Sequence, residues 1–371
     1  MARSILHIFP SFGIGGQQRR LVDLIAAFGD QVRHEIVSLD EDLGARALLP
    51  AGTRVDVRAL PLAKSGVISP TNIQMLRHVM IEANPGHLCT YNWGSMEAVL
   101  AWRSLRNTDF STGKRPIHLH FEDGFGPDES LSRQHAKRVL ARRMALARSM
   151  VVVPSFGLEV LARERWKLAP ERVRRLGNGI DLARFSVARP ALSAGDPVVV
   201  GSVGAFRREK RFDRLIEAAQ AVATKHLCTV TLVGDGPELP MLKNLAARVQ
   251  DDLTVSLPGA TRVAEEWYAK FDLFMMSSET EQMPISLMEA MAAGLPVIAT
   301  RVGDIDRMIS DENKSFIVEN GDLDGLAAAL GKLVADADLR QRLGAANARK
   351  AMAEFGRERM ITDYSALFGL T

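Results

Sequence analysis

Two glutamates in the second half of the chain offer the clearest chemistry. Seven residues separate Glu281 from Glu289, and Pro284 between them indicates that a helix begins there. Glu281 then lies at the helix entrance, and Glu289 lies about two turns further along roughly the same face. Each carboxylate accepts several hydrogen bonds, so the pair suits hydroxyl-rich ligands such as sugars and ribose. Apolar neighbours of Glu289 favour partial burial over an ordinary solvated pair.

A glycine-rich segment around Gly15 and Gly16 follows the first expected strand and opens a helical stretch. Such a segment lets backbone N–H groups approach an anion, typically a phosphate. A dinucleotide-binding loop would need a third glycine where Gln18 stands, and an acidic residue about 20 positions later, which Asp40 could supply. The missing glycine disfavours an NAD-dependent oxidoreductase. It leaves an anion site and a plain strand-to-helix turn as alternatives.

Two histidines and two acids end an expected strand in the first half, just before Gly124. His118 and His120 share one side of that strand because side chains alternate along it. Glu122 and Asp123 follow directly. A structural role and a role near the reacting atoms are both open for His120 and for Asp123.

The segment 133–148 contains six Lys and Arg and no acidic residue. Four of its apolar residues recur at helical spacing and predict a stripe that packs on the core. They are Ala136, Leu140, Met144 and Ala147. The basic remainder is either a solvated face or a surface for anionic lipid headgroups or a lipid-diphosphate acceptor. Nucleic acid is disfavoured as a partner because no aromatic residues interleave with these cations.

The length and composition of the chain indicate what class of protein carries these residues. The chain has 371 residues, 47% hydrophobic and 25% charged, which is typical of a folded protein of about two domains. No apolar run reaches the roughly 18 residues of a membrane-spanning helix, and the N-terminus does not resemble a signal peptide. The only two cysteines, Cys89 and Cys228, are expected to be buried thiols in a reducing compartment. We therefore expect a cytoplasmic protein.

Charge divides unevenly along the chain. Residues 1–190 carry 27 Lys and Arg against 18 Asp and Glu, whereas the remainder carries 20 against 26. The first half is therefore the one expected to attract anionic partners.

Short apolar runs alternate with helical patterns throughout, and the alternation starts twice. This predicts two α/β domains with parallel sheets covered by helices on both faces. The expected strands are 5–9, 35–39, 55–60, 87–91, 117–121 and 150–153, then 198–203, 229–233, 253–257, 271–276, 296–300 and 315–318. Residues 185–197, rich in Pro, Gly, Ala and Ser, are the best linker candidate.

The segment from Glu281 to Thr300 resembles the E-x7-E signature of the family 4 retaining glycosyltransferases. Other segments match the same family in order, so the resemblance covers nearly the whole chain. They are Gly15-Gly16, 178–181 with Phe185, 201–204 leading to Lys210, 233–238, 257–259 and 302–304. Within that family, the chain looks most like transferases of bacterial envelope or exopolysaccharide assembly.

The resemblance implies the GT-B fold, in which two Rossmann-like domains face each other across a cleft. Residues 1–189 would bind the acceptor, with a C-terminal helix in 355–371 packing back on them. Residues 190–354 would bind the nucleotide sugar. The reaction would transfer a hexosyl-type group from a nucleotide-diphosphate sugar to an envelope glycan or lipid-linked acceptor, with retained configuration. It would need no metal and no cofactor, and it would take place at the inner face of the membrane.

Individual roles follow from the same resemblance. Glu281 would bind the donor sugar, Glu289 the ribose, and Lys210 with a nearby arginine the diphosphate of the leaving nucleotide. His120 or Asp123 would lie near the reacting sugar. The complete set expected to bind the donor is Gly15, Gly16, Arg207, Lys210, Gly234, Gln282, Met283, Pro284 and Glu289.

Two departures from the family pattern keep alternatives open. Ala205 stands where the family usually has an arginine, which Arg207, Arg208 or Arg211 could replace. Gln282 and Met283 replace the usual Gly-Phe. A nucleotide-sugar isomerase or epimerase on the same fold, and an inactive sugar-nucleotide-binding module, are the alternatives to a transferase.

Overall fold

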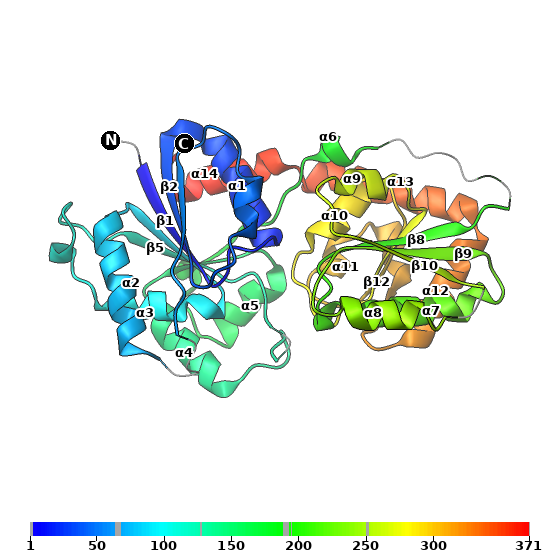
Figure 1. Ribbon diagram of the computed structural model, residues 1–371, viewed down its shortest axis with the longest axis horizontal. Helices are drawn as coiled ribbons and strands as arrows, with labels where there is room; N and C mark the ends of the chain where they lie inside the picture. Colours follow the sequence, from blue (N-terminus) through cyan, green and yellow to red (C-terminus); the bar gives the residue numbers. More distant parts are fainter. Residues whose placement is uncertain are drawn as a thin grey trace. The chain divides into compact units, whose positions relative to one another are not determined.

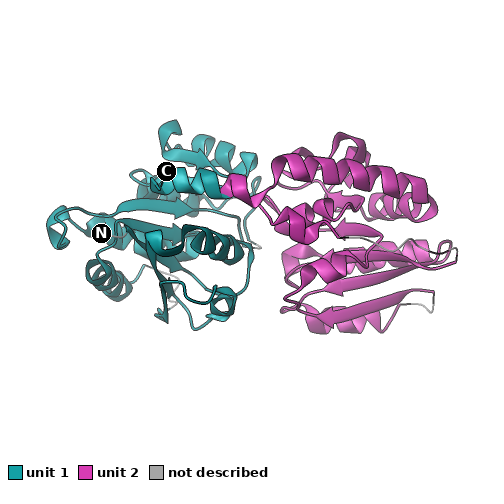
Figure 2. Ribbon diagram, turned by 90° about the horizontal axis from the view of Figure 1, so that it is seen from above, with its two compact units in different colours: residues 1–177, 361–371 teal, residues 178–360 magenta. Residues whose placement is uncertain are grey.

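The computed structural model describes residues 3–63, 68–126, 128–187, 193, 195–249 and 252–370. The chain forms two compact units (Figure 2). Unit 1 comprises Met1–Gly177 together with Ile361–Thr371, and unit 2 comprises Asn178–Met360. Residues 178–187 thus group with unit 2, where Phe185 is buried in an apolar cluster. Residues 188–192 and 194 of the expected linker lie outside the described residues.

Unit 1 is built on a seven-stranded sheet of order β3-β2-β1-β4-β5-β6-β7, in which every pair of neighbours is parallel. Most of these strands are apolar runs, because a parallel sheet is covered on both faces. They span Arg3–Phe9 (β1), Val32–Ser38 (β2), Val55–Ala59 (β3), His87–Tyr91 (β4), Ile117–Phe121 (β5), Met150–Val153 (β6) and Val173–Arg175 (β7). The sequence analysis missed β7, which has only three residues, two of them exposed arginines.

Helices cover both faces of this sheet (Figure 1). Their bounds are Gly16–Phe28 (α1), Pro70–Ala83 (α2), Met96–Ser104 (α3), Ala136–Leu146 (α4), Phe156–Glu164 (α5) and Arg357–Phe368 (α14). One cluster joins α2 and α3 to β1 and β4. The end of α14 joins α1 through Phe368, whose ring meets those of Phe28 and His87 edge-on. Tyr364 of the same helix stacks on Phe121.

Helix α4 exposes the face that the sequence analysis assigned to the core. Leu140 and Met144 are 53% and 59% exposed, and Ala136 and Ala147 are exposed too. The buried positions are Arg142, Ala145 and Leu146. The predicted stripe was therefore wrong. Arg142 takes the inward position because it pairs there with two buried acidic side chains, Glu122 and Glu129, as described below.

Unit 2 is built on a six-stranded parallel sheet of order β10-β9-β8-β11-β12-β13. Its strands span Val198–Val203 (β8), Cys228–Val233 (β9), Thr254–Gly259 (β10), Leu273–Met276 (β11), Val297–Thr300 (β12) and Ile317–Val318 (β13). In each unit, therefore, the structure confirms the expected Rossmann-like α/β sheet.

One apolar cluster on this sheet contains the buried faces of α7, α8 and α12, and a second contains those of α9 and α10 (Figure 1). The helices span Leu182–Phe185 (α6), Phe212–Ala223 (α7), Leu239–Ala246 (α8), Ala264–Tyr268 (α9), Ile285–Ala292 (α10), Ile305–Met308 (α11), Leu323–Ala335 (α12) and Ala337–Glu354 (α13). Short 3-10 helices span Gly29–Gln31, Gly44–Leu48, Trp93–Ser95, Asn107–Asp109, Pro170–Arg172, Arg208–Lys210 and Asp311–Phe316.

The cysteines and the length of the helices were the subject of two expectations from the sequence. Cys89 and Cys228 are both buried and free, as predicted. Among the described residues, no helix combines the length and apolar character that crossing a bilayer needs.

Buried histidines lie inside the unit 1 sheet. His7 hydrogen-bonds Tyr91 at 2.8 Å and His34 at 3.0 Å. Burial lowers the pKa of His34 to about 4, and burial together with His34 lowers the pKa of His7. Both imidazoles therefore stay neutral in the folded protein at a pH where the unfolded chain already binds protons.

We expect the free energy of unfolding to decrease as pH falls below the ordinary histidine pKa of 6.5, because only the unfolded state gains protons there. His34→Leu removes one such group and should flatten this decrease by up to about 1.4 kcal/mol per pH unit. Urea denaturation at pH 7, 6 and 5 measures the slope. His78→Leu, on the exposed surface of α2, is the matched control. Equal slopes in all three proteins would contradict the prediction.

Candidate functional site

The strand ends of unit 2 gather three loops at one edge of the sheet. The Phe206 N–H after β8 donates to the Asp235 carbonyl after β9 at 2.8 Å, and the Gly234 N–H donates to Gly259 at the end of β10 at 2.9 Å. A Cβ on Gly234 would come within 1.9 Å of the Gly204 carbonyl oxygen, so only glycine fits this approach. Ligands of open α/β sheets bind beyond this carboxyl edge.

Lys210 and Glu281 meet at the same edge, from loops 71 positions apart in sequence. The Lys210 Nζ lies 2.5 Å from Glu281 Oε1, and the Ser278 hydroxyl donates to that oxygen at 2.8 Å. The lysine side chain is 27% exposed and the glutamate side chain 8%. An accessible cation thus stands beside a largely enclosed carboxylate.

The loop that carries Glu281 is fixed from two sides. Gly303, at φ +58°, lies so close that a Cβ there would be 2.3 Å from the Glu281 carbonyl oxygen. The Asp304 N–H donates to the Gln282 carbonyl at 3.0 Å, and the Asn178 side-chain amide donates to the Met283 carbonyl at 2.9 Å. These contacts hold residues 281–283 ahead of α10, whose N-cap is Pro284.

Glu289 lies on α10 and is buried, as its apolar neighbours suggested. The Tyr268 hydroxyl, on α9, donates to Glu289 Oε2 at 2.8 Å. Sequence reasoning missed Tyr268, because no spacing relates α9 to α10. The tyrosine fixes one carboxylate oxygen in place.

The arginines near Lys210 differ in their surroundings. Arg207 and Arg208 are exposed at the 3-10 turn Arg208–Lys210, and neither forms an ion pair with any residue that the structure describes. Arg211 instead pairs with Asp213 at 2.7 Å and with Glu279 at 2.5 Å. Hydrogen bonds to these two acids raise the pKa of Arg211. Arg207 is therefore freer than Arg211 to meet an anion.

The glycine-rich turn of unit 1 leads straight into α1. Gly15 is the N-cap and Gly16 the first helical residue. Gln18, in the place of a third glycine, donates from its side-chain amide to the Ser11 carbonyl at 3.0 Å. Asp40 accepts from Ser38 and from the Asp42 N–H within its own turn. Gln18 and Asp40, the two residues that decide whether this loop fits a dinucleotide-binding pattern, therefore both form local hydrogen bonds in unit 1.

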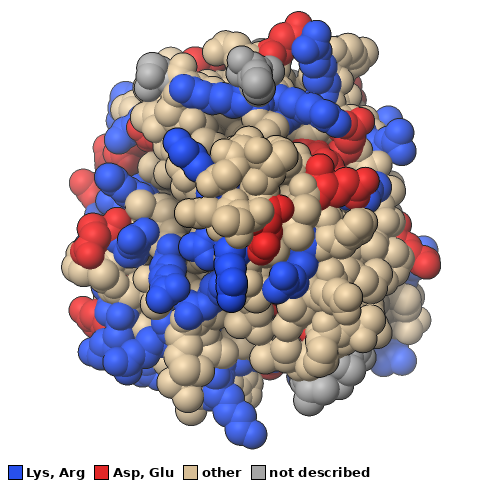
Figure 3. Space-filling model, turned by 90° about the vertical axis from the view of Figure 1, so that its left-hand side faces the viewer, with Lys and Arg blue, Asp and Glu red and all other residues tan. Residues whose placement is uncertain are grey.

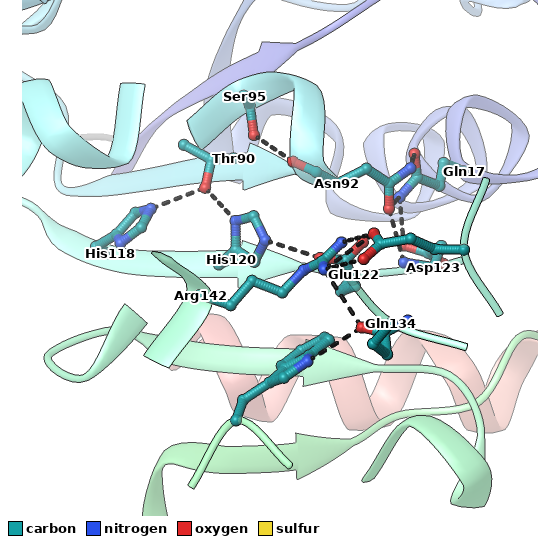
Figure 4. Close-up of polar contacts among 12 residues, drawn as sticks. Gln17, Thr90, Asn92, Ser95, His118, His120, Glu122, Asp123, Gln134 and Arg142 are labelled. Carbon is teal, nitrogen blue, oxygen red and sulfur yellow. Dashed lines mark hydrogen bonds and ion pairs between the residues drawn. The ribbon is translucent and has the colours of Figure 1, made fainter. Parts of the chain in front are cut away.

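Two side chains of α1 hold Asp123, and Figure 4 shows one of them, Gln17. Arg20 donates to both carboxylate oxygens, at 2.5 and 2.9 Å, and Gln17 donates to Oδ2 at 2.5 Å. Burial would lower the pKa of Arg20, but Asp123 raises it. The Asp123 side chain is 13% exposed. Both of its oxygens are thus already engaged.

Asn92 is a polar residue at this position that the sequence analysis missed. It directly follows β4 with φ +52°, an uncommon value for a residue other than glycine. Its Oδ1 accepts from the Asp123 N–H at 2.8 Å, and its side-chain amide donates to Gln17 at 3.1 Å (Figure 4). The strained backbone therefore orients the residue that fixes Asp123.

His120 lies beneath this position and is fully buried. Its Nδ1 contacts the Thr90 hydroxyl at 2.8 Å, which also contacts His118 Nε2 at 2.9 Å, so the two histidines share one face as expected (Figure 4). Its Nε2 lies 3.5 Å from Glu122 Oε2. The imidazole therefore faces the interior of unit 1.

A buried arginine supports the loop after β5. Arg142 lies 3.4 Å from Glu122 and 3.1 Å from Glu129. The aromatic rings of Trp93, Phe125 and Trp166 surround its guanidinium. Burial alone would raise the pKa of Glu129, but hydrogen bonding and the charge of Arg142 lower it. Arg142 ties Glu122, which directly follows β5 (Figure 4), and Glu129 to helix α4.

Comparisons with known families agree with this geometry. The sequence model described as Glycosyltransferase Family 4 matches residues 14–184, and the one described as Glycosyl transferases group 1 matches residues 197–336. The chain belongs to the family 4 glycosyltransferases.

Curated relatives of this family 4 chain match over part of its length. N-acetyl-alpha-D-glucosaminyl L-malate synthase of Bacillus anthracis is 30% identical over 44% of this chain and 43% of its own. The lipopolysaccharide core biosynthesis glycosyltransferase LpsE of Rhizobium meliloti is 33% identical over 52% and 54%. The matched stretch thus spans about half the length of these relatives.

A solved structure resembles the family 4 chain over its full length. Anabaena HepE, in complex with UDP and glucose, has a TM-score of 0.78 at 17% identity, covering 100% of both chains. This likeness establishes the fold, and with the two parallel sheets it confirms GT-B.

Arg142→Met should destabilise the protein by about 3–5 kcal/mol, because it removes the arginine that pairs with buried Glu122 and leaves buried Glu129 with Arg138 alone. Urea denaturation at pH 7 measures the change. Arg143→Met, at the exposed neighbouring position on the same helix, is the control and should stay within about 0.5 kcal/mol of the wild type. A cost below about 1 kcal/mol for Arg142→Met would contradict the role assigned to this cluster.

Proposed function

We propose that the chain transfers a hexosyl-type group from a nucleotide-diphosphate sugar to an envelope glycan or lipid-linked acceptor, with retained configuration and without a metal. One observation carries the proposal: Lys210 and Glu281 meet at the carboxyl edge of the unit 2 sheet. The names of relatives in lipopolysaccharide core synthesis support the acceptor class.

The donor fits this edge by charge and hydrogen bonding. Lys210, with exposed Arg207, supplies the cations that a leaving diphosphate needs. Glu281 offers a carboxylate for sugar hydroxyls, and Glu289 offers one for the ribose hydroxyls. The backbone of Gln282, Met283 and Pro284 would contribute to holding the diphosphate.

In the proposed reaction, the bond between the anomeric carbon and the diphosphate oxygen breaks as the acceptor oxygen attacks the same face. The acceptor proton passes to an oxygen of the departing phosphate. Neither enclosed His120 nor Asp123, whose oxygens already accept from Arg20 and Gln17, is needed as a base in this route. Both then act by shaping unit 1.

The acceptor side of the proposal places the protein in the cytoplasm at the inner face of the membrane. Residues 133–148 would meet the anionic surface there, close to a lipid-linked acceptor. The proposal includes no nucleic acid and no cofactor.

A thermal-shift panel of uridine, guanosine, adenosine and cytidine diphosphates, followed by their sugar conjugates, identifies the donor. Product formation from that donor with an envelope glycan acceptor, unchanged by EDTA, would support metal-independent transfer. The anomeric configuration follows from NMR of the product. Donor consumption without an acceptor would instead indicate an isomerase or epimerase. Nucleotide binding without turnover would indicate an inactive module.

Glu281→Gln and Lys210→Ala should each lower kcat/KM by at least roughly 100-fold, because each removes a charge expected to act on the donor. Steady-state turnover measures the loss, and circular dichroism verifies that each variant is folded. Glu266→Gln and Lys225→Ala, both exposed in unit 2, are the matched controls. Wild-type turnover in either site variant would remove the proposed role of that residue.

A further inference from the structure

Helix α4 presents an apolar stripe to solvent that no described residue covers. Leu140 and Met144 lie one turn apart and are more than half exposed. Lys137 and Arg143 are exposed three residues before and after Leu140, on the adjoining helix surface. Two large apolar side chains flanked by cations form an amphipathic surface of the kind that lies in a lipid interface.

Cations from other segments extend this surface at the end of α4. Arg103, on α3, donates to the Met144 and Ala145 carbonyls at 2.6 and 3.0 Å. Arg115 lies over the Trp102 ring at 4.1 Å. Burial and the charges of Arg148 and Arg103 lower the pKa of Arg115, because like charges disfavour one another.

These cations lack carboxylate partners. Within the described ranges, no ion pair joins an Asp or Glu to Lys137, Arg143, Arg148, Arg103 or Arg115. Figure 3 shows one face of the molecule, on which Lys and Arg gather in the lower middle while Asp and Glu group mainly toward the upper right and the left edge. The positive charge of these five residues is therefore not cancelled by direct ion pairs among the described residues.

We infer that the exposed face of α4, together with Arg103, Arg115 and Arg148, is a docking surface for an anionic lipid membrane. Leu140 and Met144 enter the interface between headgroups and acyl chains, and the cations contact lipid phosphates. A membrane fits better than a folded protein because its charge complements an acid-free cluster, and its interior accepts isolated apolar side chains without a shaped pocket.

The inference deepens the proposed function, on which it rests for the acceptor side of the reaction. Vesicle binding is nevertheless measured without donor or acceptor. A protein that transfers sugar to a free glycan but ignores vesicles would refute the docking surface alone. A protein that binds vesicles but turns over no donor would refute the transferase alone.

Cosedimentation with vesicles of phosphatidylcholine, with and without phosphatidylglycerol, tests the surface on the full chain. We expect binding only to the anionic vesicles, decreasing as salt is raised. Lys137→Glu with Arg143→Glu should weaken binding by on the order of 25-fold, about fivefold for each cation. Leu140→Ser with Met144→Ser should weaken it by at least roughly tenfold.

Matched double variants in unit 2 serve as controls. Leu227→Ser with Met352→Ser, and Lys225→Glu with Lys332→Glu, change equally exposed positions and should bind as the wild type does. Absence of wild-type binding to anionic vesicles at low salt would overturn the inference, as would unchanged binding in both α4 variants. Light scattering that shows a dimer broken by Leu140→Ser with Met144→Ser would assign the face to a second copy instead.

Discussion

The ion pair between Lys210 and Glu281 sets the electrostatic state of the unit 2 strand ends. At 2.5 Å, the two charges neutralise each other while no anion is present. A diphosphate that approaches Lys210 must therefore compete with Glu281, whose Oε1 retains a hydrogen bond from Ser278. Because Glu281 is mostly enclosed, its freed oxygen would need a new donor in the proposed reaction, and a sugar hydroxyl would supply one. Phosphate and sugar binding are coupled through this pair in the proposed reaction.

Unit 1 places its charges differently, because its polar residues are enclosed and paired with one another. Asp123 is clamped by Arg20 and Gln17, and Glu122 and Glu129 share Arg142. Removing one member of such a buried set lowers the free energy of unfolding by far more than the intact set adds to it, because a buried charge is left unpaired. These residues therefore specify the conformation of the loop after β5.

Both sheets could be predicted from the sequence, because their strands are apolar runs spaced by helical patterns. β7 could not be, since its three residues carry no such run. The start of the helix that carries Glu289 was placed correctly by Pro284, and the burial of Glu289 by its neighbours. Glu281 lies in the loop before this helix, so the expected shared helical face of the two glutamates was wrong. Contacts between separate elements were beyond spacing arguments: Tyr268 meets Glu289, and Arg142 meets Glu129, only once those elements pack against each other. The assignment of Lys210 came from family resemblance, not from the residues alone.

The spacing of apolar residues in helix α4 did not predict which face of the helix is buried, and the reason is a charged side chain. An argument from hydrophobic periodicity assumes that the apolar side chains of a helix are the buried ones. That assumption holds when the interior contains no charged group that needs a partner of opposite charge. Here two carboxylates and three aromatic rings create a place for a guanidinium, and Arg142 occupies it. That choice fixes the rotation of the helix and turns Leu140 and Met144 outward. The exposed stripe of Leu140 and Met144 is thus a direct consequence of the burial of Arg142. The same arginine side chain also supports the loop after β5.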